Sequence, residues 1–326
     1  MKQTDKVTPK PNTTETAHQY PDKLTKASLQ VKSTIVDLLK NFVRPSVTKG
    51  LDYEGLTLDN TTYISPAMKA LFSDVVYRST CGDSNVSVAV LVEHKTRMEL
   101  YPHLQLLDYK GSIWRHDEAN EKPLTAVIAI VLYQNPYNYT KKDFHKYFVN
   151  LPPHLRRFIP HFDYILINVS TISDKQILAL APDSILRSML LAYKHASDNV
   201  YVKKHFQEFF RFFDGNPHLE YYFQQMLVYV QHYADISPEE LIALIQTFND
   251  SSIKKKAMST YDQIVLQSKT ETHLTYIKKL LMKGFNIIEI ADFTDLPIEN
   301  VKKYIAQIEK EEKEKIVIKK KNGAKK

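Results

Sequence analysis

The order of the segments between residues 74 and 169 constrains the fold of this chain more than any other feature. Two short runs rich in β-branched residues flank a polar turn, which is the pattern of a β-hairpin. A helical pattern follows, and then come two runs that are almost wholly apolar, as expected of strands covered on both faces. The chain is therefore expected to be an α/β protein. The strand runs are 74–78, 86–92, 126–132 and 164–169, and the turn is 81–85.

Apolar residues at helical spacing predict helices before and between these strands. Residues 26–43 form an amphipathic pattern that stops before Pro45. After the second strand run, five residues fall on one stripe that we expect to face the core. These are Leu100, Leu104, Leu107, Gly111 and Trp114.

The stretch from Ser173 to about Thr270 is helical and aromatic in pattern, and the segment 237–240 is typical of a helix start. Its phenylalanines could form a platform for base stacking. Aromatic residues at helical spacing are more often core, however, and we favour that interpretation. They are Phe206, Phe209, Phe210, Phe212 and Phe213.

The two ends of the chain differ in composition from the middle. Residues 1–20 are rich in Thr, Lys and Pro with hardly an apolar residue, which predicts disorder. Residues 272–308 suggest two short helices around Leu296 and Pro297. That arrangement suits a helix-turn-helix, although any small helical hairpin produces the same pattern.

The net charge of +7 is concentrated at the ends. Residues 301–326 carry +6 and residues 1–50 carry +5, which leaves −4 for residues 51–300. The terminal lysines favour an anionic partner such as DNA, but a merely solvated tail explains the last residues equally well. The candidate DNA-binding lysines are Lys302, Lys303, Lys319, Lys320 and Lys321.

Composition excludes several classes of protein. One cysteine, Cys81, rules out an internal disulfide framework and any multi-thiolate metal site, and seven glycines make a glycine-rich phosphate loop a poor expectation. The histidines lack the helical spacing of a zinc site. No long apolar window and no signal-peptide pattern at the N-terminus are present, so we expect no membrane span and a cytoplasmic protein.

Three residues suggest chemistry: Asp74 at the head of the first strand, and Glu93 and Lys95 at the end of the second. Residues two apart in a strand project from the same face, so Glu93 and Lys95 share a face while the side chain of His94 points away. Antiparallel pairing is expected to bring Asp74 and Arg78 toward Glu93, where two carboxylates can hold a hard cation. Lys95 would supply positive charge for a phosphate.

The side chains of two further residues could point into the same site. Gln105 and Tyr109, four apart, lie on one face of the following helix, and this face differs from the leucine stripe. Each residue also has a plain structural interpretation, since Asp74 could cap a turn, Glu93 and Lys95 could be an exposed pair, and Gln105 could be solvated. The combination, in this order and on these elements, favours a site.

This arrangement resembles the restriction-endonuclease-like PD-(D/E)XK nuclease core. More closely, the strings 72–76, 91–96, 106–109 and 130–133 resemble the Rpn family of recombination-promoting nucleases, also called transposase-like proteins. The similarity covers most of residues 25–308. It divides the chain into a disordered segment (1–20), a nuclease-like domain (21–170), a C-terminal helical region (171–270), a helix-turn-helix-like segment (271–310) and a basic tail (311–326).

The resemblance implies roles for the same residues. Asp74 and Glu93 would bind Mg²⁺ or another divalent cation such as Mn²⁺, with the His94 carbonyl as a further ligand, and Lys95 would position water and stabilise charge. Gln105 and Tyr109 correspond to a helix motif of RecB-type nucleases. Asp37 is the nearby candidate for an additional acid from the first helix.

The sequence thus predicts a metal-dependent DNA endonuclease linked to recombination, mobile elements or defence. Its rival is a non-catalytic DNA-binding or interaction protein on a degenerate nuclease scaffold. Pro297 stands where the C-terminal motif of the family usually offers Ser or Thr, and proline cannot cap the second helix with its side chain. Operator-like recognition by that helix is therefore in doubt, and assembly into a homo-oligomer is left open.

Overall fold

The computed structural model describes residues 19–59, 75–93, 101–133, 140–212 and 217–323. The chain divides into two compact units, one formed by Ala17–Ala257 and the other containing Met258–Lys326. The boundary falls inside one long helix, α11 (Ser251–Met282). Within the described residues, no helix combines the length and apolar character needed to cross a membrane.

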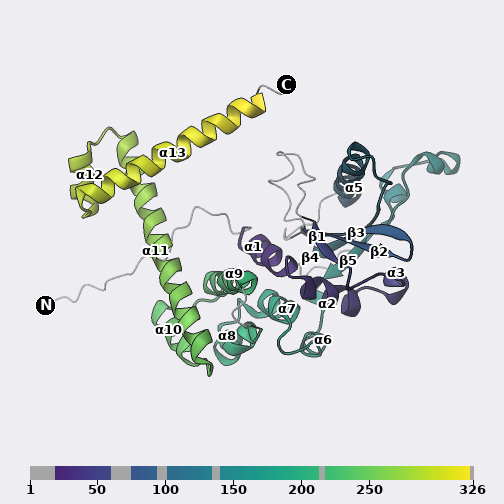
Figure 1. The fold of residues 1–326 in the computed structure, drawn as a ribbon, viewed down its shortest axis with the longest axis horizontal. Helices are drawn as coiled ribbons and strands as arrows, with labels where there is room; N and C mark the ends of the chain where they lie inside the picture. Colours follow the sequence, from purple (N-terminus) through teal and green to yellow (C-terminus); the bar gives the residue numbers. More distant parts are fainter. Residues whose placement is uncertain (1–18, 60–74, 94–100, 134–139, 213–216, 324–326) are drawn as a thin grey trace. The chain divides into compact units, whose positions relative to one another are not determined.

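The first unit contains a mixed five-stranded sheet within the described residues, with the strands in sequence order (Figure 1). The first strand pairs with the second, and the second with the third, in antiparallel fashion. The third, fourth and fifth strands run parallel to one another. The strands are β1 (Thr57–Asp59), β2 (Val75–Cys81), β3 (Ser84–Glu93), β4 (Ala126–Tyr133) and β5 (Ile165–Asn168). The predicted α/β class and the four predicted strand runs are confirmed.

The hairpin between β2 and β3 turns more tightly than the polar segment suggested. Cys81 pairs with Ser84, so the turn itself holds only Gly82 and Asp83. Gly82 has a φ of +59°, a conformation that costs glycine little because it has no Cβ. The short turn fixes the register along the whole hairpin.

Helices cover both faces of the sheet. Helix α5 (Pro102–Ala119) packs Tyr109 and Ile113 against Val76 and Val131 in one apolar cluster. On the other face, the fully buried Tyr77 donates its hydroxyl hydrogen bond to the carbonyl of Leu29 at 2.9 Å. Because successive residues of β2 point to opposite sides, these contacts show that β2 is buried on both faces. The last five residues of β4 are all buried, which confirms the prediction of burial on both faces for that strand, whereas in β5 only Ile167 is buried.

The core-facing side of α5 differs from the predicted stripe. Leu104 is 49% exposed and Leu107 is half-buried, whereas His103, Leu106 and Ile113 are buried. The prediction was therefore wrong for the described residues of the stripe, while Leu100 lies outside the described residues. The side of α5 that packs on the sheet is set by where the aromatic and branched residues of β2, β4 and the segment before β5 lie. Leu107, Gly111 and Trp114 instead line an open groove on the outside of the helix.

The N-terminal helical pattern forms two helices rather than one. These are α1 (Gln19–Leu29) and α2 (Lys32–Phe42), and a short helix, α3 (Pro45–Thr48), follows. The break falls at the β-branched Val31, which has an extended backbone with φ −89° and ψ 120°. Tyr20, at the end of the segment expected to be disordered, is buried and stacks on His232 at 4.0 Å.

The helical region after the sheet forms an aromatic core in the first unit. The four described phenylalanines of the predicted set are at most 5% exposed, which confirms the core interpretation, while Phe213 lies outside the described residues. Ser237 and Glu240 form the predicted cap at the start of α10. The helices are α6 (Asp174–Leu178), α7 (Ile185–His195), α8 (Asn199–His205), α9 (Pro217–Tyr233) and α10 (Pro238–Gln246).

The second unit has its own small core. The end of α11 packs with α12 (Ile287–Thr294) and α13 (Ile298–Gly323) around Ile277, Ile290 and Val301. Ile298, the first residue of α13, is 44% exposed, but Val301 and Ile308 are buried. Helix α13 continues through most of the basic segment at the C-terminus.

Candidate active site

Three strand ends meet at one edge of the sheet. Glu93 is the last residue of β3 and pairs with Tyr133, the last residue of the parallel strand β4. On the antiparallel side, β2 begins at Val75, which pairs with Val90. The start of β2 and the ends of β3 and β4 therefore meet at the same edge.

Three predicted site residues, Asp74, His94 and Lys95, lie outside the described residues. Their positions next to strand ends follow from the sequence, because Asp74 precedes β2 directly and Lys95 follows Glu93 by two residues. Their roles stay predictions. Within the described part of the chain, no group of three or more His, Cys, Asp or Glu side chains is arranged to hold a metal ion.

The first turns of α5 carry the other two predicted residues. Gln105 is half-buried, and Tyr109 is only 2% exposed. Tyr109 packs against Val76 and Val131. Val76 is the second residue of β2 and Val131 lies two residues before the end of β4, so both are close to the edge where Glu93 lies. Tyr109 is therefore part of the core between α5 and the sheet.

Arg78 does not lie near Glu93, contrary to the prediction. It pairs with Ser87, six residues before Glu93 on β3, which corresponds to about 20 Å along a strand. The prediction was wrong because a two-residue turn fixes the hairpin register and leaves Arg78 near the turn end of the sheet.

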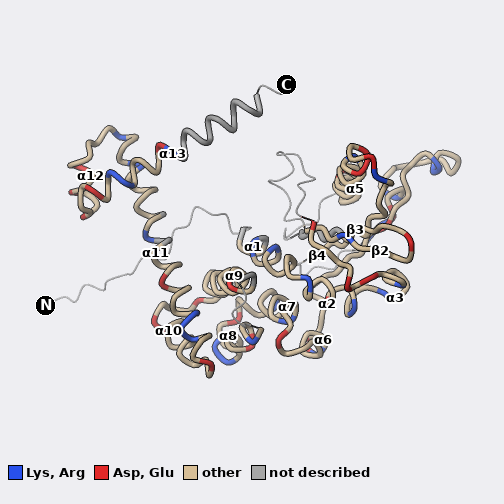
Figure 2. Tube along the Cα trace, viewed as in Figure 1, with Lys and Arg blue, Asp and Glu red and all other residues tan. Residues whose placement is uncertain are grey.

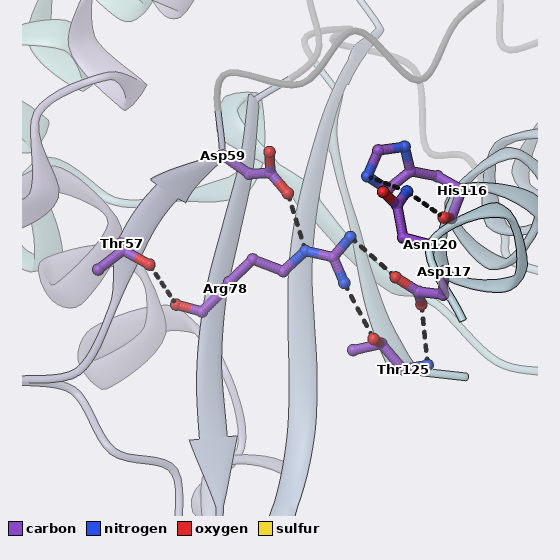
Figure 3. Close-up of polar contacts among 7 residues, drawn as sticks. All are labelled: Thr57, Asp59, Arg78, His116, Asp117, Asn120 and Thr125. Atoms are coloured by element: carbon purple, nitrogen blue, oxygen red, sulfur yellow. Dashed lines mark hydrogen bonds and ion pairs between the residues drawn. The ribbon is translucent and has the colours of Figure 1, made fainter. Parts of the chain in front are cut away.

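Arg78 instead joins three elements through a polar network (Figure 3). Its Nε donates to Asp59 on β1 at 2.8 Å, and one terminal nitrogen donates to the hydroxyl of Thr125 at 2.9 Å. The other terminal nitrogen lies 3.3 Å from a carboxylate oxygen of Asp117 on α5. The second oxygen of Asp117 accepts the backbone N–H of Thr125 at 3.0 Å.

This network fixes the C-terminal end of α5 to the sheet. Asp117 is 1% exposed and Thr125 is 5% exposed, so the charges are largely removed from water. Such a cation and such hydrogen bonds compensate a carboxylate for the loss of water on burial. No local sequence pattern predicts the network, because its members come from four separate segments.

A second buried polar group lies at the other end of α5. His103 is 2% exposed, stacks on Phe144 at 5.1 Å, and has no hydrogen-bond partner for its Nδ1 within the described residues. Burial, helped by the positive charge of Lys141, lowers the pKa of His103. Burial also lowers the pKa of Lys110, whose Nζ donates to the carbonyl of Asp163 at 3.3 Å.

The remaining candidates lie elsewhere. Asp37 on α2 accepts a hydrogen bond from Ser184 at 2.6 Å, which ties α2 to the N-cap of α7. Lys302 and Lys303 are exposed on α13. Lys319, Lys320 and Lys321 belong to the last part of the same helix.

Comparison with known proteins identifies relatives of this chain. The family described as "Putative transposase, YhgA-like" matches residues 19–220. The recombination-promoting nuclease RpnD of Escherichia coli O157:H7 is 25% identical over 130 residues, which cover 38% of this chain and 49% of RpnD. The inactive recombination-promoting nuclease-like protein RpnE of Escherichia coli K12 is 22% identical over 191 residues, covering 57% of this chain and 61% of RpnE.

The chain thus spans about half to three-fifths of the length of these two curated relatives. No solved structure matches it at a significant level. The family match covers the sheet, α5 and the helices through the start of α9, which include the edge of the sheet where Glu93 lies.

Proposed function

The chain belongs to the YhgA-like transposase family, and from this we propose that it is a metal-dependent DNA endonuclease with a PD-(D/E)XK core. The observation that carries the proposal is the strand register. It brings the start of β2 and the ends of β3 and β4 to one edge, next to which the sequence places Asp74, Glu93 and Lys95.

The proposed donors suit a hard divalent cation. Mg²⁺ prefers carboxylate and carbonyl oxygens, which Asp74, Glu93 and the His94 backbone would supply. The register also supports placing Glu93 on the face of the sheet that α5 covers. Glu93 pairs with Tyr133, and paired positions of neighbouring strands belong to the same face. Val131, two residues before Tyr133, packs under α5.

The residues would divide the work of phosphodiester hydrolysis. The bound ion, Mg²⁺ or Mn²⁺, would neutralise phosphate charge and lower the pKa of a water molecule. Asp74 and Glu93 would hold it, and the Lys95 ammonium would stabilise charge that develops on the attacked phosphate. Gln105 would orient a water molecule or phosphate from the first turns of α5, while the buried Tyr109 would keep α5 in place.

The second candidate is a non-catalytic DNA-binding protein on the same scaffold. One observation favours it, since the relative that matches the longer stretch of this chain carries "inactive" in its name. Intact Glu93 and Lys95 favour the enzyme.

Plasmid cleavage in Mg²⁺ separates the two candidates. We expect wild type to nick or linearise plasmid, and Glu93→Gln and Asp74→Asn to lose orders of magnitude in rate, because an amide keeps the shape but lacks the charge that a hard cation needs. The control is Glu118→Gln, which removes an equal charge at the exposed C-terminal end of α5. Undiminished cleavage in EDTA, or by the Glu93→Gln protein, would contradict the proposal.

A further inference from the structure

The connection between β4 and β5 is unusual for two adjacent parallel strands. It spans residues 134–164, and its described part, residues 140–164, contains two short 3-10 turns, Phe144–Tyr147 and Pro153–Phe158. The 25 described residues contain no α-helix and no strand, and stretches of this length without either are uncommon in compact domains and are usually functional. We call residues 140–164 the basic arm; it is the teal segment at the right-hand edge of Figure 1.

The root of the basic arm is held firmly. Phe144 is buried and stacks on His103 of α5 with an interplanar angle of 12°. Lys141 donates to the carbonyl of Tyr164 at 2.8 Å and forms an ion pair with Asp163. These contacts fix both ends of the arm, so the remaining residues are presented from a rigid base.

The outer part of the basic arm exposes apolar surface. Phe158 is 70% exposed, Val149 is 88% exposed, and Phe148 is 43% exposed. Several large apolar side chains exposed on one segment are more often a binding surface than a feature without function. Two of these exposed side chains, Phe148 and Phe158, are aromatic.

The basic arm carries a net positive charge, although the middle of the sequence is net negative. Residues 140–164 carry five Lys or Arg and two Asp, a net charge of +3, within a span, 51–300, whose total is −4. Both acids are already engaged by lysines of the arm, since Lys141 pairs with Asp163 and Lys146 pairs with Asp143 at 3.1 Å.

Three cations of the basic arm remain, and Figure 2 shows blue positions along this segment. Lys142, Arg156 and Arg157 are exposed, and none pairs with an acidic side chain of the described residues. The guanidinium carbon of Arg157 lies 4.9 Å from the ring centroid of Phe158. Adjacent arginine and exposed aromatic side chains match the two parts of a nucleotide, its phosphate and its base.

We propose that the basic arm binds unpaired nucleotides of a DNA strand, with Arg156 and Arg157 contacting phosphates and Phe158 stacking on a base. Single strands suit it better than duplex, because a base must leave its pair to reach an exposed ring. The inference rests on the proposed function for the identity of the ligand. The proposal adds a DNA-binding surface that does not include the terminal lysines.

Binding, measured without cleavage, tests the proposal. All variants are made in the Glu93→Gln background of the full chain, and fluorescence anisotropy follows a labelled single-stranded oligonucleotide and its duplex at several salt concentrations. Arg156→Ala/Arg157→Ala should make the slope of log affinity against log salt shallower by about 1.4, at about 0.7 per phosphate contact. The control is Lys175→Ala/Lys204→Ala, which removes two exposed cations elsewhere in the same unit.

Stacking has its own variant. Phe158→Ala should weaken single-strand binding about 5- to 150-fold, with a smaller effect on duplex, and Phe158→Trp should retain binding. Unchanged unfolding midpoints would show that these exposed substitutions leave the fold intact.

The outcomes separate this inference from the proposed function. If the arm variants bind like the Glu93→Gln parent while cleavage by the wild type depends on Glu93, the arm inference fails and the nuclease stands. If wild type does not cleave but the arm variants lose single-strand binding, the nuclease fails and the arm inference stands. Equal losses in the arm variants and the control would assign the effect to overall charge and overturn the inference.

Discussion

Replacing Arg78 tests the polar network at the turn end of the sheet. Arg78→Met keeps the aliphatic stem but leaves Asp117, 1% exposed, without its cation. Removing one partner of a buried ion pair costs about 3–5 kcal/mol, and we expect the lower end because the Arg78 side chain is 25% exposed. Asp59, at 11% side-chain exposure, loses the same partner.

Asp117→Asn should cost less. An asparagine oxygen can still accept the backbone N–H of Thr125, and Arg78 keeps its contact with Asp59. The loss of one charged contact predicts about 1–3 kcal/mol. Since the two residues touch, the double variant should lose less than the sum of the single variants, by about 0.5–3 kcal/mol.

Urea unfolding followed by tryptophan fluorescence measures these differences. The chain has a single tryptophan, Trp114, and its indole N–H donates to the carbonyl of Thr125 at 2.9 Å, so the probe lies beside the network. The reasoning would be refuted if each single variant lost less than about 1 kcal/mol of unfolding free energy and the two losses added in the double variant. Residues that contact each other in a buried ion pair should show a coupling energy. Loss of cleavage without loss of stability would instead make Arg78 part of the site.

Three further predictions concern catalysis, pH and the C-terminus. Lys95→Ala should lower single-turnover cleavage about 10²- to 10³-fold with little change in DNA affinity, and an equal loss in binding would mark it as a phosphate anchor. Because burial and Lys141 lower the pKa of His103, the unfolded state binds more protons just below its ordinary value of 6.5, so stability should fall as pH drops from 7 to 5. His103→Phe should flatten that loss in urea titrations at each pH, and parallel curves would contradict it. Deleting residues 311–326, beyond the last core residue Ile308, should make the salt slope of DNA binding shallower by a few units while saturating single-turnover cleavage stays unchanged.

The parts of the fold that the sequence predicted well depend on local signals. The strand runs and the hairpin were predicted because β-branched residues and Gly82 act over a few positions. Register and helix orientation were predicted poorly, as with Arg78 and Leu104, because the turn length and the partner surface decide them. The candidate site was predictable in part. The strand pattern predicts the edge of the sheet at which the site would lie, while the relative placement of Asp74 and Lys95 stays a prediction.

The contrast between two sets of phenylalanines shows which sequence signal separates core from surface. Phe206, Phe209 and Phe210 recur at helical spacing and are at most 2% exposed. Phe158 follows two arginines in a segment whose prolines, at 152 and 153, prevent a long helix, and it is 70% exposed. A repeating apolar pattern can bury its rings on one face, whereas a proline-interrupted basic segment offers no such face. Aromatic residues of the second kind are therefore the ones to test for contact with nucleotides.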